Sequence, residues 1–160
     1  MGATSSPRTG GAILADGLLA HGADTVFCVP GESFLAFLDA AHDRRDRLSL
    51  IVCRQEGGAA FMAEAWGKAT GRPGLCFVTR GPGACNAAIG VHTAFQDSTP
   101  MVLLVGQVER RARGREAFQE VEYRLMFAPL AKHVEEVFDA AAIPEALARA
   151  FAAASQGRPG

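Results

Sequence analysis

One carboxylate in this sequence stands where an apolar stretch gives way to a helical pattern. Glu56 follows the run Leu48-Ser49-Leu50-Ile51-Val52-Cys53-Arg54-Gln55 and precedes four small residues, Gly57-Gly58-Ala59-Ala60. We expect it at the positive end of a helix and just beyond a strand, where ligands bind in open α/β sheets. The small residues leave space for a flat group to come close. The alternative is that Glu56 only complements the helix dipole, a contribution of about 0.3–1 kcal/mol.

Two further stretches, Pro30-Gly31-Glu32 and Gly81-Pro82-Gly83 to Asn86, each follow an apolar run. The carboxyl ends of parallel strands face the same way, so these loops would share one rim with Glu56. Gly81-Pro82-Gly83 could hold a phosphate at a helix N-terminus. It has neither the G-x-x-x-x-G-K-[ST] nor the G-x-G-x-x-G spacing, and a tight strand-to-helix turn is the alternative. The residues alone predict an α/β domain with a carboxylate in a ligand-binding rim.

Short apolar runs alternate with helical patterns along the chain, which predicts a three-layer α/β/α fold around a mainly parallel, twisted sheet. The predicted strands are residues 25–29, 48–53, 75–79 and 101–105, with a fifth short strand near Lys132–Val137. The predicted helices begin near residues 9, 34, 56, 82, 123 and 143. Residues 107–115 carry many charges and are expected to form a surface loop.

Composition limits the classes of function. The 160 residues fit one domain, with residues 1–8 as a flexible lead-in and 9–160 as the folded part. The net charge of −1 gives no sign of a nucleic-acid surface, and no apolar run approaches the ~20 residues of a membrane span. The cysteines (Cys28, Cys53, Cys76 and Cys85) have no C-x-x-C spacing and the histidines no metal-ligand spacing. We therefore expect buried thiols, no metal site and a cytoplasmic protein.

Four motifs in one order carry a family resemblance. They are Val29-Pro30-Gly31-Glu32, Arg54-Gln55-Glu56-Gly57-Gly58-Ala59-Ala60, Thr79-Arg80-Gly81-Pro82-Gly83-Ala84-Cys85-Asn86 and Ala117-Phe118-Gln119-Glu120-Val121. Together they resemble the N-terminal pyrimidine-binding domain of thiamine-diphosphate enzymes, most closely the acetolactate synthase-like branch. The resemblance covers roughly residues 8–160.

The resemblance implies roles for individual residues. Glu56 would hydrogen-bond the cofactor's aminopyrimidine and favour the tautomer that removes the thiazolium proton. Pro30, Gly31, Gly83 and Asn86 would border the aminopyrimidine. Phe118 and Gln119 would lie on the substrate side, with Gln119 among the catalytic residues, although core packing is the alternative for Phe118.

The resemblance also implies partners outside this chain. The substrate would be a 2-oxo acid, decarboxylated or ligated by a homodimer or homotetramer with its active site between subunits. Magnesium would bind in a separate domain, FAD is possible, and neither nucleic acid nor membrane is expected.

Some residues depart from the pattern, which leaves the substrate open. Gln55 replaces the usual His, Cys85 stands where Thr or Ser is common, and Glu32 stands where a second Gly is frequent. Gly71-Arg72-Pro73-Gly74 precedes a predicted strand and Gly157-Arg158-Pro159-Gly160 repeats it, so a C-terminal strand is expected after Gly160. We expect this chain to be an inactive fragment of a longer multidomain enzyme.

Two other functions are consistent with the sequence. The chain could be a non-catalytic module that keeps the thiamine-diphosphate fold for dimer assembly, although Glu56 would then have no purpose. It could also be an α/β domain for another nucleotide or acyl-CoA, against which the missing phosphate-loop spacings count.

Overall fold

A parallel four-stranded sheet forms the centre of the molecule in a computed structural model, which describes residues 8–160. The strands are β1 (Thr25–Cys28), β2 (Ser49–Val52), β3 (Gly74–Val78) and β4 (Met101–Val105), in the order β2-β1-β3-β4. Leu50, Val26, Leu75 and Val102 lie side by side across the sheet. The carboxyl ends of all four strands therefore meet at one edge, as the sequence predicts.

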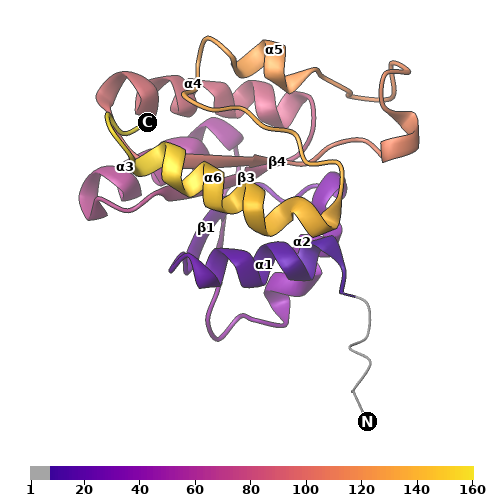
Figure 1. Cartoon of the computed structure of the whole chain (residues 1–160), viewed down its shortest axis with the longest axis horizontal. Coiled ribbons are helices and arrows are strands. Elements are labelled where there is room, and N and C mark those ends of the chain that lie inside the picture. Colours follow the sequence, from indigo (N-terminus) through magenta and orange to yellow (C-terminus); the bar gives the residue numbers. More distant parts are fainter. Residues whose placement is uncertain (1–7) are drawn as a thin grey trace.

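Helices cover both faces of the sheet (Figure 1). One face carries α1 (Gly10–Ala20), α2 (Leu35–His42) and α6 (Ile143–Ser155). The other carries α3 (Glu56–Thr70), α4 (Pro82–Asp97) and the short α5 (Tyr123–Phe127). Three single 3-10 turns complete the described elements, at Glu32–Phe34, Arg110–Ala112 and Ala140–Ala142. The three-layer α/β/α fold is thus confirmed.

The local sequence explains how the central elements begin and end. Every residue of β3 is buried, as expected for an inner parallel strand with helices on both sides. At the start of α3 the Gln55 side chain accepts a hydrogen bond from the Gly58 N–H at 2.9 Å. At its end Gly71 takes a left-handed conformation with φ +69°. These signals fix the helix that carries Glu56.

Three expectations need correction or lie outside the described residues. The prediction of a fifth strand near Lys132–Val137 is wrong. This segment makes no backbone–backbone hydrogen bond within residues 8–160, because a cavity separates it from β4. The segment 107–115 is not uniformly exposed, since Arg113 is largely buried among Glu120, Glu122 and Glu136. The predicted flexible lead-in falls on residues 1–7, outside the described part, except for Arg8.

Candidate functional site

Glu56 is the first residue of α3 and lies half-buried at the carboxyl edge of the sheet. Its side chain is anchored from the neighbouring helix: Asn86 Nδ2 donates a hydrogen bond to Glu56 Oε2 at 2.9 Å. The other oxygen, Oε1, receives no hydrogen bond from any residue in 8–160. One carboxylate oxygen is held in place and the other is available to a ligand.

Gly83 keeps space open beside that oxygen. A Cβ added to Gly83 would lie 2.9 Å from Thr79 Cγ2 and 3.6 Å from Glu56 Oε1. The helices that carry Glu56 and Asn86 also cross closely, because Gly90 of α4 lies directly against Ala60 of α3. Small residues therefore set the geometry of the Glu56–Asn86 pair.

The turn between β3 and α4 is fixed by the loop that follows β4. Gly81 has φ +58°, and its N–H donates to the Tyr123 hydroxyl at 2.8 Å. Pro82 then occupies the first turn of α4, where its missing N–H costs nothing. This arrangement is a tight strand-to-helix turn, which was the alternative to a phosphate-binding loop for Gly81-Pro82-Gly83.

Phe118 and Gln119 lie against this turn through their backbone. A Cβ added to Gly81 would lie 2.7 Å from the Gln119 carbonyl oxygen, and Arg80 Nε donates to the Phe118 carbonyl at 3.2 Å. The Phe118 side chain is 76% exposed, so core packing does not explain it. The loop thus carries a large apolar side chain into solvent at the rim.

Pro30 and Gly31 follow β1 at the same edge of the sheet. Pro30 is exposed, whereas a Cβ added to Gly31 would lie 2.5 Å from Thr79 Cβ. Ser33 Oγ lies 2.9 Å from Thr79 Oγ1 and ties the β1 and β3 loops together. The structure therefore brings Glu56, Gly83 and Asn86 together and places Gly31 at Thr79. No hydrogen bond within the described chain joins Glu56 to Pro30 or Gln119.

Sequence reasoning missed two residues that shape the rim. Tyr123 is buried, and burial raises the pKa of its hydroxyl, so this group stays neutral where it accepts the Gly81 N–H. Arg80 also bonds Glu32, with 3.3 Å between Arg80 Nη2 and Glu32 Oε2. Tyr123 is the only tyrosine in the chain, which was the one available signal.

The four cysteines differ in their burial. Cys28 and Cys76 are buried as expected, and burial raises the pKa of the Cys28 thiol to about 11. Cys53 is half-buried and Cys85 is exposed, so burial does not hold for all four. Within residues 8–160, no three His, Cys, Asp or Glu side chains gather as a metal site. None of the helices in this part has the length and apolarity to span a membrane.

Comparison with known proteins defines the class. The family described as "Thiamine pyrophosphate enzyme, N-terminal TPP binding domain" matches residues 8–126. The chain belongs to this family, and it is a pyrimidine-binding domain of the acetolactate synthase-like type.

Individual relatives are acetolactate synthases from distant organisms. The chain is 42% identical over 160 residues to the acetolactate synthase large subunit of Parasynechococcus marenigrum, covering 98% of this chain and 26% of that protein. It is 38% identical over 158 residues to the chloroplastic enzyme of Arabidopsis thaliana, covering 99% and 23%. It is 41% identical over 151 residues to the acetolactate synthase of Bacillus subtilis, covering 94% and 26%. The chain thus spans about a quarter of the length of these relatives.

Proposed function

We propose that this chain is the pyrimidine-binding part of a longer thiamine-diphosphate-dependent enzyme that decarboxylates or ligates 2-oxo acids. One observation carries the proposal. The Glu56 carboxylate is held through Oε2 by Asn86, while Oε1 has no hydrogen-bond partner in residues 8–160 and lies beside the space that Gly83 keeps open.

These residues fit an aminopyrimidine ring. Gly83 removes the side chain that would crowd Glu56 Oε1, and Gly58 has no atom within 4 Å of where its Cβ would be. When bound, thiamine diphosphate supplies a carbon nucleophile that also accepts the electrons released by decarboxylation. Glu56 would hold or release a proton at Oε1 for the bound ring, and Asn86 would hold the carboxylate through Oε2 so that Oε1 stays free.

The remaining rim residues have supporting roles in this proposal. Pro30 and Gly31 form a wall of the ring pocket. Phe118 and Gln119 face the substrate, because Arg80 holds their loop at the Gly81 turn and leaves the Phe118 ring in solvent. Gln119 has φ +63°, a conformation that points to a constrained position in this loop.

The proposal extends to partners that this chain does not contain. A homo-oligomer would complete the active site between subunits, and the exposed apolar side chains of β2, α3 and α4 would lie at that contact. These side chains are Ile51, Val52, Phe61, Met62 and Ile89. Magnesium would bind in another domain, FAD is a further possible cofactor, and the cytoplasm is the proposed location.

The alternative of a non-catalytic module for dimer assembly is not favoured. All three relatives described above are named as enzymes. A scaffold would also have no use for a rim carboxylate whose Oε1 has no hydrogen-bond partner within residues 8–160.

The test is Glu56→Gln in the longer protein. We expect pyruvate turnover to fall by about 100-fold or more, the usual contribution of a positioned acid–base group. Thiamine diphosphate affinity, measured by calorimetry, should fall as well. The free energy of unfolding should change by less than about 1 kcal/mol, the size of a helix-dipole contribution.

Glu145→Gln is the matched control, because Glu145 is an exposed first-turn glutamate of α6 and loses the same helix-dipole interaction. It should leave turnover unchanged. Equal turnover by the Glu56→Gln variant and the unmodified enzyme would defeat the role assigned to Glu56.

A further inference from the structure

The loop that carries Phe118 and Gln119 is held together by one carboxylate, that of Glu120. Its Oε1 accepts a hydrogen bond from the Gly114 N–H at 2.6 Å, and its Oε2 accepts one from the Ala117 N–H at 3.1 Å. The Glu120 N–H donates to the Ala117 carbonyl at 2.8 Å. Only 12% of the Glu120 side chain is exposed. Both carboxylate oxygens therefore bind backbone of the loop instead of reaching into solvent.

The loop backbone has conformations that need such support. Glu116 has φ +54° and Gln119 has φ +63°. Residues with a Cβ rarely adopt these left-handed angles, and they keep them only where surrounding contacts hold the backbone. The two N–H groups that Glu120 binds belong to Gly114 and Ala117, which lie on either side of Glu116 and just before the turn at Gln119. Glu120 thus holds the part of the loop that is strained.

Glu120 acts on the loop as a charged group. The hydrogen bond from the Gly114 N–H lowers the pKa of Glu120, and the backbone N–H groups of Ala117 and Arg115 and the charge of Arg113 contribute further. The side chain is therefore ionised at neutral pH, and hydrogen bonds to an ionised acceptor are stronger than those between neutral groups. A glutamine offers only one oxygen, and its amide group would face one of the N–H donors.

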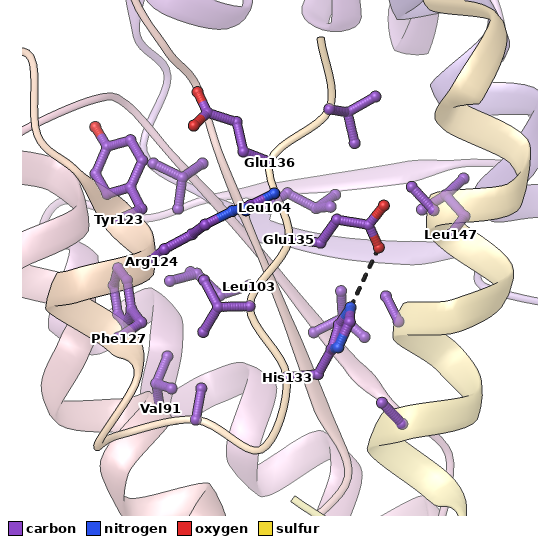
Figure 2. Close-up of a pocket in the computed structure, with 18 of the residues that line it drawn as sticks. Val91, Leu103, Leu104, Tyr123, Arg124, Phe127, His133, Glu135, Glu136 and Leu147 are labelled. Carbon is purple, nitrogen blue, oxygen red and sulfur yellow. Dashed lines mark hydrogen bonds and ion pairs between the residues drawn. The ribbon is translucent and has the colours of Figure 1, made fainter. Parts of the chain in front are cut away.

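Arg113 connects this carboxylate to the segment 131–138. Arg113 Nε lies 3.3 Å from Glu120 Oε1, and Arg113 Nη2 donates to Glu136 Oε2 at 2.8 Å. Figure 2 shows that the Glu136 side chain points away from α6, whereas Glu135 points toward that helix. The loop is therefore tied to the body of the molecule through Arg113.

The other side of the loop is fixed at the rim. Arg80 Nε donates to the Phe118 carbonyl, and the Gln119 carbonyl lies 2.7 Å from where a Cβ of Gly81 would be. These contacts use backbone atoms, so they leave the exposed Phe118 ring free, and the Gln119 amide has no hydrogen-bond partner in the described part of the chain. The backbone of the two residues lies between the β3–α4 turn and the Glu120 carboxylate.

We propose, building on the function proposed above, that Glu120 is a positioning residue for the 2-oxo acid substrate. Its carboxylate holds the strained turn so that the Gln119 side chain meets the substrate in one fixed place. Glu120 acts through Gln119 and does not touch the substrate itself. Fixed backbone matters here because a displacement of about 1 Å at a reacting centre can reduce the rate by about 100-fold.

The test is Glu120→Gln in the longer protein, which keeps the size of the side chain and removes its charge and one acceptor. We expect kcat/KM for pyruvate to fall by about 10- to 100-fold, because the Gln119 turn is no longer held. Thiamine diphosphate affinity, measured by calorimetry, should stay unchanged. No hydrogen bond in the described chain joins Glu120 to Glu56 or Asn86.

Glu116→Gln is the matched control. Glu116 is an exposed glutamate of the same loop, and its side chain makes no hydrogen bond or ion pair within residues 8–160. Its substitution removes the same charge and should leave kcat/KM for pyruvate unchanged. An unchanged kcat/KM in the Glu120→Gln variant as well would overturn the role of Glu120.

A double-mutant cycle with Gln119→Ala separates positioning from a general loss of structure. If Glu120 acts through Gln119, adding Glu120→Gln to the Gln119→Ala variant should lower kcat/KM little further. Losses that multiply in the double variant would overturn the proposal, because Glu120 would then act independently of Gln119.

Glu120→Asp gives the same test if Glu120→Gln does not fold. It keeps the charge beside Arg113 but withdraws the carboxylate by one methylene, so it cannot reach both N–H groups. The same fall in kcat/KM and the same cycle with Gln119→Ala are expected. A failure of the proposed function would look different, because turnover and cofactor affinity would then be unchanged in the Glu56→Gln variant.

Discussion

The rim around Glu56 differs in its contacts from the cavity beside β4, which we call the β4 groove. The groove is lined by β4, α5, α6 and residues 131–138, and it belongs to the same sheet as the rim. At the rim, short connections between consecutive elements place polar groups and glycines, and hydrogen bonds such as Asn86–Glu56 and Gly81–Tyr123 close the geometry. At the groove, apolar side chains surround an open space of about 450 Å³, and the two backbone edges beside it have no backbone partner within residues 8–160. Hydrogen bonds close the rim, whereas the groove is an open apolar space.

Tyr123 belongs to both regions. Its ring lines the groove, and its hydroxyl accepts the Gly81 N–H at the rim. The difference between the regions shows that local turns and helix packing can fix the geometry of the Glu56–Asn86 pair. Beside β4, by contrast, no strand within residues 8–160 pairs with the edge of the sheet. Three substitutions test this contrast.

The largest loss of stability is expected from Gly90→Ala, which adds a methyl group where α4 crosses α3 below the rim. A Cβ added to Gly90 would lie 2.5 Å from Ala60 Cβ and 2.8 Å from the Ala60 carbonyl carbon, so α3 and α4 must move apart. We expect a loss of about 1–3 kcal/mol in the free energy of unfolding, the usual cost of overpacking. Urea denaturation of this chain measures it.

Gly58→Ala is the matched control, because nothing lies within 4 Å of the Cβ position at Gly58. It should stabilise the chain by about 0.5–1 kcal/mol through the better helix propensity of alanine. If Gly90→Ala proved as harmless as Gly58→Ala, close packing of α3 on α4 would not set the geometry of the Glu56–Asn86 pair.

The rim could be predicted from sequence because its signals are local. Glu56 at the start of α3, the turn at Gly81 and the approach of Asn86 all follow from where a strand ends and a helix begins. The family resemblance predicted only that Phe118 and Gln119 lie on the substrate side, and no sequence pattern predicted their contact with the Gly81 turn. The Gly81–Tyr123 hydrogen bond joins residues 42 positions apart, and no periodic pattern marks it.

The predicted strand near Lys132–Val137 was wrong because strand formation depends on contacts that are not local in sequence. Residues 132–137 have a strand-like sequence, but a strand needs a partner as well as a propensity. The backbone of Val134, Glu135 and Val137 has no backbone partner in the described part of the chain, because β4 lies across the groove from them. Arg113, which also lines the groove, could not be placed from sequence either, because its burial depends on three glutamates from later segments.

A smaller loss of stability is expected from Tyr123→Phe. This substitution changes the contact of Tyr123 with the rim and leaves its contact with the groove unchanged. The ring stays in the groove wall, but the Gly81 N–H loses its acceptor in a buried place. An unsatisfied buried donor costs about 1–3 kcal/mol, and we expect the loss near the lower value because the substitution leaves the packing of the ring unchanged. Urea denaturation gives the free energy, and exchange of the Gly81 amide should become faster.

Phe127→Leu serves as the comparison, because it alters the groove wall and leaves the hydrogen bond to Gly81 intact. Its Gly81 amide should exchange as slowly as in the unmodified chain. If Tyr123→Phe also left that amide unchanged, the hydroxyl would not be what holds the turn.

The smallest effect is expected at the outer wall of the groove, where Glu135 pairs with Arg149. The hydrogen bond from Arg149 lowers the pKa of Glu135 to about 2, with a further contribution from His133. A carboxylate with a lowered pKa stabilises the folded state above its ordinary pKa, and this contribution is lost as the pH falls toward 2. Because half of the Arg149 side chain is exposed, we expect Glu135→Gln to cost only about 0.5–1 kcal/mol at pH 7.

The difference in stability between the variant and the unmodified chain should shrink as the pH falls from 5 to below 3, following the protonation of Glu135. Glu145→Gln removes an exposed carboxylate of α6 that lies 3.8 Å from the same Arg149, and it should have a smaller effect on the unfolding temperature throughout this pH range. Thermal unfolding across this pH range measures both variants, and a constant difference for Glu135→Gln would mean that its ion pair does not hold the segment to α6.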